Sequence, residues 1–201
     1  DKFPPGYVDG VLYPFSQIRL CNAYNSDLVD DDAAKALSTW DGILDSRWKD
    51  KAGVVKFGGG GVQLLPYYFM YKEKGEEFLT SMLHGQKPLL VESVPSLTEK
   101  LAAGGIDTVF FANDGNLNTL YSQGAPVRWK CPSPALVQYN YQFIGADAPH
   151  LGAAKLWIEF ITSEYGQKMV MDSLGLGAVL TTLDDTRPAA KESWFDAPKD
   201  G

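Results

Sequence analysis

Short apolar runs typical of strands alternate with helical patterns between residues 54 and 130 of this 201-residue chain. The strand-like runs lie at residues 54–57, 89–91, 106–111 and 127–130. Helical patterns with short connections separate them, and such alternation predicts an α/β fold with a mainly parallel sheet flanked by helices on both faces. Ligands of such sheets bind at the carboxyl ends of the strands.

A run of four glycines joins the first of these strands to the next helix. Without side chains the backbone can approach a ligand closely, and the first N–H groups of a helix can bind an anion or a polar oxygen. The run lacks the lysine and hydroxyl residue of a nucleotide P-loop, so a plain tight turn is the alternative. The binding residues predicted here are Gly58, Gly59, Gly60, Gly61, Val62 and Gln63.

A second polar segment, with Asn113, Asp114 and Asn116, follows the strand predicted at 106–111. We expect a turn at 113–115 and a helix over 116–123. Because the carboxyl ends of parallel strands share one edge of a sheet, this turn and the glycine run should face one cleft. The main-chain N–H groups at this edge suit a small polar or anionic solute.

Three further expectations concern the helices and strands of this region. Pro66 should lie in or near the first turn of a helix over 62–74, where a missing N–H is tolerated. The sequence Ser96-Leu97-Thr98-Glu99 has the form of a capping box, so a helix should begin there and end at Gly104–Gly105. Residues 89–91 are expected to form a buried strand.

The flanking segments carry less information. Residues 1–17 are rich in proline, glycine and aromatics and predict an extended opening segment, followed by a strand at 18–24. Alternation over 137–143 predicts a half-buried strand, and Ser163 should cap a helix that ends at Gly175. In the polar tail, Trp194 and Phe195 are the expected docking point.

Composition and motifs narrow the function classes. The net charge of −7, without a basic cluster, argues against nucleic-acid binding, and no apolar run is long enough to span a bilayer. Neither histidine, His84 or His150, belongs to a catalytic or metal-binding motif, so we predict no enzyme, no metal site and no cofactor. Cys21 and Cys131 are either free thiols or one disulfide, and free thiols are favoured.

Several stretches together resemble the bacterial extracellular solute-binding proteins of ABC importers, of the two-lobe type that includes ferric-iron, thiamine and phosphonate binders. They are Thr39-Trp40-Asp41-Gly42-Ile43-Leu44 with Trp48-Lys49-Asp50-Lys51, the longer match from Ala148-Pro149-His150 to Ser163-Glu164-Tyr165-Gly166-Gln167, and the shorter Gly124-Ala125-Pro126-Val127 and Tyr24-Asn25.

The resemblance implies a periplasmic-binding-protein type II-like fold with the ligand between two lobes. Residues 18–130 would form a complete lobe two, residues 131–175 a return to a partial lobe one, and residues 176–201 a tail. The first part of lobe one would be absent, through truncation or proteolysis, with a homodimer as one way to cover the incomplete lobe. A disulfide between Cys21 and Cys131 becomes possible.

The resemblance also bears on the ligand. Ferric members carry a tyrosine pair after the strand matching 106–111, whereas this chain has Ala112-Asn113-Asp114 there, which disfavours iron bound by phenolates. We expect a periplasmic or extracellular solute-binding component whose partners are a small solute or metal complex and the membrane subunits of an importer. The alternatives are an enzyme acting on a small phosphate-containing substrate and a fragment without ligand competence.

Overall fold

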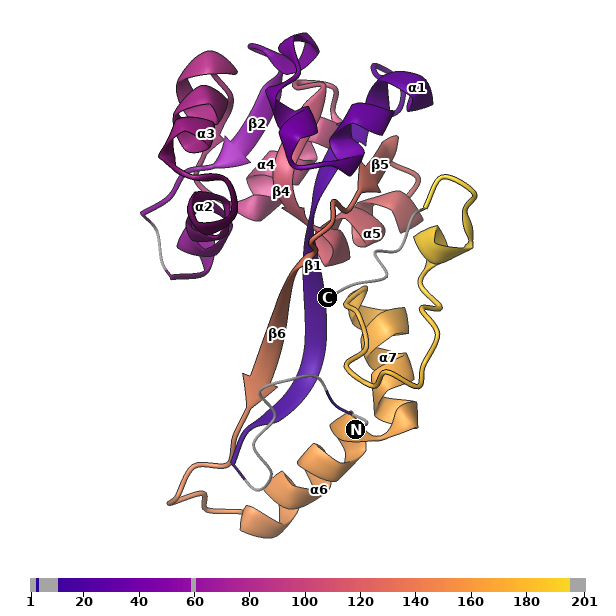
Figure 1. Ribbon diagram of the computed structural model, residues 1–201. Coiled ribbons are helices and arrows are strands. Elements are labelled where there is room, and N and C mark those ends of the chain that lie inside the picture. Colours follow the sequence, from indigo (N-terminus) through magenta and orange to yellow (C-terminus); the bar gives the residue numbers. More distant parts are fainter. Residues whose placement is uncertain (1–2, 4–10, 59–60, 196–201) are drawn as a thin grey trace.

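A computed structural model describes residues 3, 11–58 and 61–195. Its longest strand, β1 (Tyr13–Asn25), runs from the central sheet into the region that also contains α6 (Leu151–Thr162) and α7 (Glu164–Leu174), as Figure 1 shows. Its second half lies in the central sheet, and its first half pairs with β6 (Leu136–Gln142). Residues 13–17, expected in an irregular opening segment, belong to this strand. The expectation was wrong because their partner lies more than a hundred residues away, beyond the reach of local patterns.

The sheet has the order β3-β2-β4-β1-β5, with β6 paired to β1. Its other strands are β2 (Ala52–Val55), β3 (Leu89–Val91), β4 (Thr108–Asn113) and β5 (Val127–Lys130). β2 is parallel to β3 and β4, whereas β1 runs antiparallel between β4 and β5. The predicted mainly parallel α/β sheet is therefore confirmed, with one antiparallel strand inserted. We call the part around β2 to β5 the sheet lobe.

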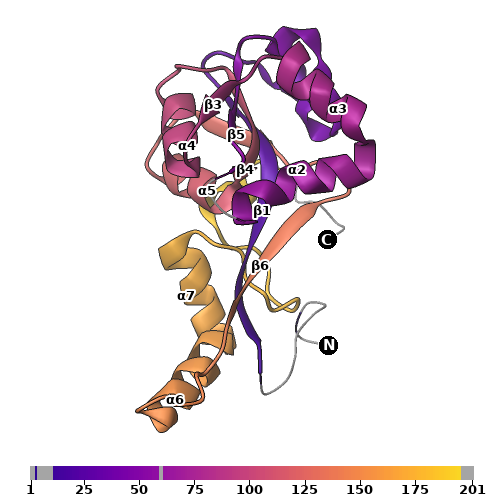
Figure 2. The same ribbon diagram turned by 90° about the vertical axis from the view of Figure 1, so that its left-hand side faces the viewer.

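Helices cover both faces of the sheet lobe (Figure 2). One face packs against α2 (Gly61–Lys74) and α3 (Glu76–Thr80), which continues into the π turn Ser81–Gly85. The same face packs against α1 (Asp31–Ala34) and the three 3₁₀ turns that follow it, Lys35–Ser38, Asp41–Leu44 and Ser46–Trp48. The other face packs against α4 (Val94–Ala102) and α5 (Asp114–Ser122). Two cores result, which we call the α2 core and the α4–α5 core.

Below the sheet lobe, β6 is followed by α6 and α7, which lie beside the first half of β1 (Figure 1). Gln167 fixes this arrangement: its amide nitrogen donates to Phe15 O at 2.9 Å, and its oxygen accepts from Val179 N at 2.7 Å. Ser163 caps α7 and Gly175 ends it in a left-handed conformation, as predicted. The outer faces of these helices expose large apolar side chains, including Leu156, Trp157 and Tyr165.

Local expectations failed at three places in the sheet lobe. Pro66 lies in the second turn of α2, because the helix already begins at Gly61. The cap of α4 is Ser93 and not Ser96. The helix begins earlier because the proline beside its first residue has a φ that already suits a helix. β3 is an edge strand, so Leu89 and Leu90 are exposed and only its last residue is buried.

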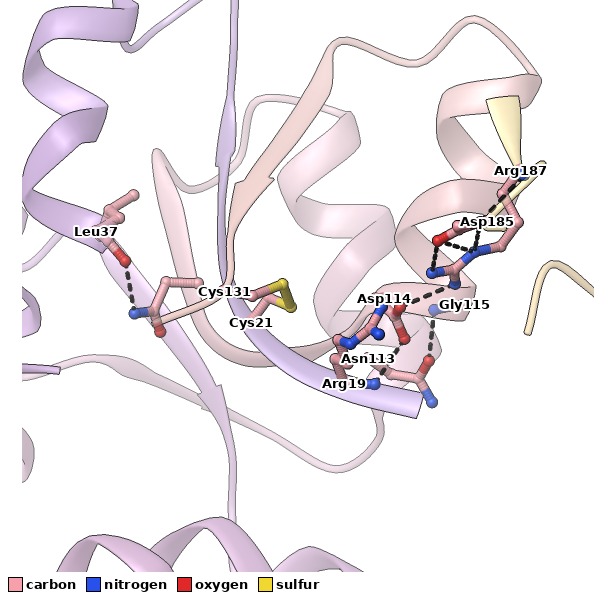
Figure 3. The surroundings of a disulfide bond; sticks show 10 residues. Arg19, Cys21, Leu37, Asn113, Asp114, Gly115, Cys131, Asp185 and Arg187 are labelled. Atoms are coloured by element: carbon pink, nitrogen blue, oxygen red, sulfur yellow. Dashed lines mark hydrogen bonds and ion pairs between the residues drawn. A yellow bond between two sulfur atoms is a disulfide. The ribbon is translucent and has the colours of Figure 1, made fainter. Parts of the chain in front are cut away.

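Cys21 and Cys131 form a disulfide that joins β1 to the residue after β5 (Figure 3). The free-thiol interpretation was therefore wrong. The bond closes a loop with a sequence separation of 110 residues and lies in the α4–α5 core. In the same core the tail docks as predicted, with the Trp194 ring 5.0 Å from that of Trp129. After these aromatic residues the chain leaves the described region.

Candidate ligand-binding site

A β-bulge in β4 shapes the candidate site. The pairing of β1 with β4 shifts register between Cys21 and Ala23, and Phe111 has φ = +59°, a left-handed conformation uncommon for residues other than glycine. Consecutive side chains of a regular strand point to opposite faces, but both Phe110 and Phe111 belong to the α2 core. The bulge therefore places two aromatic rings on one face at the carboxyl end of β4.

A pocket lies above these rings, enclosing about 60 Å³ of space. It is formed where the carboxyl ends of β2 and β4 meet the starts of three helices and the long strands β1 and β6. Most of its lining is apolar, and its polar side chains are all carboxamides. The lining residues are Ile18, Leu20, Val55, Gln63, Pro66, Tyr67, Val94, Phe110, Phe111, Asn113 and Gln138.

Tyr67 forms the aromatic wall opposite the bulge. Its ring lies 6.0 Å from that of Phe111, and its hydroxyl donates a hydrogen bond to the carbonyl of Val55. Burial raises the pKa of Tyr67 to about 12, because the charged phenolate would lose its hydration. The side chain is therefore neutral at physiological pH and contributes apolar surface rather than a metal ligand. Its neighbour Tyr68 is exposed, so this pair divides between core and rim.

The glycine run is only partly described. Gly58 is exposed with φ = +121°, and a side chain there would meet open space. Gly59 and Gly60 lie outside the described residues, and Gly61 and Val62 form the first turn of α2. Gln63 lines the pocket, and its Nε2 donates to Glu92 O at 3.2 Å. Of the residues predicted here, Gln63 therefore reaches the pocket, whereas Gly58 is not part of its lining.

Asn113 lies at the end of β4 and lines the same pocket as Gln63, because β2 and β4 are parallel neighbours whose carboxyl ends share one edge of the sheet. The expected turn at 113–115 is instead the beginning of α5, two residues earlier than predicted. The Oδ1 atom of Asn113 caps this helix, accepting from Gly115 N at 2.8 Å and Asn116 N at 3.4 Å. Gln63 and Asn113 thus share one pocket, whereas Asn116 is half-buried and does not line it.

Asp114 has a different role in the structure (Figure 3). Its carboxylate is buried, pairs with Arg187 at 2.8 Å and accepts from Arg19 N at 2.8 Å. Burial by itself lowers the pKa of Arg187, but the charges of Asp114 and Asp185 raise it above its ordinary value, so the guanidinium stays charged. Both carboxylate oxygens of Asp114 are engaged, and we therefore leave this residue out of the proposed binding surface.

The site also contains residues that the sequence did not indicate. Ile18, Leu20 and Gln138 reach the pocket from β1 and β6, whose pairing joins distant segments. Gln138 stood on the polar side of a clear alternation, which was the one available signal. Nothing in the sequence marked the bulge at Phe111 or the contribution of Arg187.

Across residues 3, 11–58 and 61–195, no three histidine, cysteine or acidic side chains gather in a way that could bind a metal ion. Within the same part of the chain, no helix combines the length and apolar character needed to cross a membrane.

No protein-family model and no curated protein matches the chain. Solved structures do match it. A substrate-binding protein of an ABC transporter from Agrobacterium tumefaciens superposes with a TM-score of 0.74 at 12% identity, over 90% of this chain and 56% of its own. Iron-bound HitA from Pseudomonas aeruginosa gives 0.74 at 18% identity, over 92% and 62%. Apo FutA2 from Synechocystis PCC6803 gives 0.67 at 19%, over 94% and 69%.

Identities of 12–19% establish a shared fold rather than a shared ligand. The superpositions cover at least 90% of this chain. The chain therefore has the fold of the periplasmic binding proteins of the ABC-transporter and ferric-binding type, and it spans 56–69% of the length of the structures it matches.

Proposed function

We propose that this chain is a solute-binding component of an ABC importer, which captures a small solute at the pocket and delivers it to the importer's membrane subunits. The observation that carries the proposal is the position of the pocket. Gln63 and Asn113 flank it at the carboxyl edge of the parallel strands, where binding sites of α/β sheets lie. Ile18 of β1 and Gln138 of β6 also line the pocket, at the point where these two strands leave the sheet lobe.

The architecture supports capture by closure. β1 and β6 form the paired strands that connect the sheet lobe to α6 and α7 (Figure 2). A ligand held at this junction contacts both the lobe and its connection, so binding can favour one relative orientation of the two parts. The disulfide supports a periplasmic or extracellular location, since such bonds persist in oxidising compartments.

An enzyme acting on a phosphate-containing substrate is less well supported. The pocket is lined by apolar side chains and carboxamides, which provide neither a nucleophile nor a general base. The solved structures that share its fold include a substrate-binding protein of an ABC transporter. They give no support to the homodimer expected from the sequence, and we do not include it in the proposal.

A thermal-shift screen tests the function. The chain is heated with ferric citrate, thiamine, methylphosphonate or nicotinamide, each added separately. A solute at a hundredfold excess over its dissociation constant stabilises the folded state by about 2.7 kcal/mol. We expect at least one such shift, reduced by Gln63→Ala and kept by Gln123→Ala, a matched amide change outside the pocket at the end of α5. Turnover of a phosphate ester, or shifts insensitive to Gln63→Ala, would contradict the proposal.

A further inference from the structure

We propose that the pocket accepts an uncharged group of the ligand: a small flat body with a carboxamide-like edge that offers one N–H donor and one carbonyl acceptor. The inference rests on the proposed function and specifies the chemistry of the same site. It narrows the polar or anionic solute or metal complex expected from the sequence to an uncharged polar one.

The shape favours a flat apolar body. Phe110 and Phe111 lie together because of the bulge, and Tyr67 faces them. The space of about 60 Å³ is several times the roughly 10–15 Å³ that one water needs by this measure, so it admits a group of a few non-hydrogen atoms. The Tyr67 and Phe111 rings touch each other edge to face, and the surface that they form together attracts the face or edge of a planar group packed against it. The remainder of a larger solute would extend outside.

The carboxamides supply one acceptor and one donor. Gln138 Oε1 is buried and has no hydrogen-bond partner among the described residues, while its Nε2 makes only a long contact of 3.5 Å to Asn140. A buried acceptor without a partner is costly, and turning the Gln138 side chain toward the pocket would let a ligand N–H satisfy it. Across the pocket, the Oδ1 of Asn113 is committed to the start of α5, which leaves its Nδ2 for a ligand carbonyl.

The charges around the pocket disfavour an ion. None of its lining side chains is ionised, and the nearby Asp114 and Arg187 neutralise each other. An ion entering this space would lose its hydration without gaining a counter-charge. The starts of α4 and α5 do not provide open anion sites either, because the side chains of Ser93 and Asn113 already cap them. Their dipoles favour the oxygen of a carbonyl and oppose a cation.

Nicotinamide and nicotinate form a matched pair of probes, since they share a ring and differ by a neutral carboxamide against a carboxylate. The isotope-labelled chain is titrated with each while backbone amide resonances are followed. We expect nicotinamide to shift the resonances of Gln63, Phe111 and Asn113 and to bind about tenfold or more tightly than nicotinate, a difference of about 1.4 kcal/mol or more.

Gln138→Leu removes the unpaired acceptor and puts an apolar side chain of similar size in its place. It should weaken nicotinamide binding by about tenfold. Gln142→Leu is the control, because Gln142 lies on the same strand and does not line the pocket. It should leave nicotinamide binding unchanged, and the dispersion of the amide spectrum shows for each variant that the fold is intact.

Three outcomes would overturn the inference: equal or tighter binding of nicotinate, unchanged binding in Gln138→Leu, or no shift at the pocket with nicotinamide. Ferric citrate and thiamine separate this result from the fate of the proposed function. If either of them shifts the pocket resonances while nicotinamide does not, the solute-binding function stands and the neutral ligand class is wrong. If no probe shifts them, both proposals fail.

Discussion

Removing the charge of Asp114 should destabilise the whole molecule rather than weaken ligand binding alone. In the variant Asp114→Asn, Arg187 keeps its charge in a site where its side chain is 2% exposed. Breaking a buried ion pair from one side costs about 3–5 kcal/mol. Asp185 still pairs with this arginine at 2.7 Å and is 23% exposed, so we expect the lower end, about 3 kcal/mol.

For a chain of this size, 1 kcal/mol corresponds to about 2–4 °C in Tm, so the expected loss is about 6–12 °C. Urea unfolding followed by circular dichroism measures the free energy, and calorimetry measures the Tm. The control is Asp32→Asn, which removes an exposed ion pair to Lys35 and should leave the unfolding curve unchanged.

The double variant Asp114→Leu with Arg187→Met separates the pair from its surroundings. Replacing both partners by apolar side chains leaves no uncompensated charge at this pair, so the double variant should be more stable than Asp114→Asn. A loss below about 1 kcal/mol in Asp114→Asn, the value of an exposed pair, would refute the structural role that we give to Asp114.

Three further predictions concern stability. Reducing the disulfide between Cys21 and Cys131 should lower the free energy of unfolding by about 2–5 kcal/mol, because the unfolded chain regains the freedom of a long loop; identical urea midpoints with and without reductant would contradict this. Gly175→Ala should lower the free energy of unfolding in urea by about 1 kcal/mol or more, since φ is +67° and a Cβ would lie 3.0 Å from the Thr119 hydroxyl. The control Gly152→Ala, at an open helical position, should not lower it. Burial by itself raises the pKa of Asp185, but its arginine partner holds the pKa below its ordinary value. As the pH falls, the unfolded chain therefore binds this proton before the folded chain does, so the stability from Asp185 is complete above about pH 4–5 and is lost as the pH falls through the lower folded pKa. Urea midpoints measured against pH should fall in this range, and they should fall less steeply in Asp185→Asn.

The sequence predicted those features whose causes are local. Alternating strand and helix patterns placed β2 to β5, and Ser163 and Gly175 marked both ends of α7 because capping depends on a few neighbouring residues. The Asp30 side chain caps α1 in the same local way, accepting from Ala33 N. Local chemistry was sufficient in each case.

The features that were missed depend on distant partners. Residues 13–17 become part of a strand only through β6, and Asp114 becomes structural only because Arg187 arrives from the tail. An acidic residue after a strand looks the same in the sequence whether it faces a ligand or a buried cation. The bulge at Phe111 is likewise set by the pairing of two strands, which local periodicity cannot reveal.

A crystal structure of the chain grown with the solute that gives the largest thermal shift would show whether this pocket is the binding site. We expect electron density for the solute against Phe110 and Phe111, within hydrogen-bonding distance of Gln63, Asn113 or Gln138. Density for the solute at any other place on the molecule, with this pocket unchanged, would contradict it.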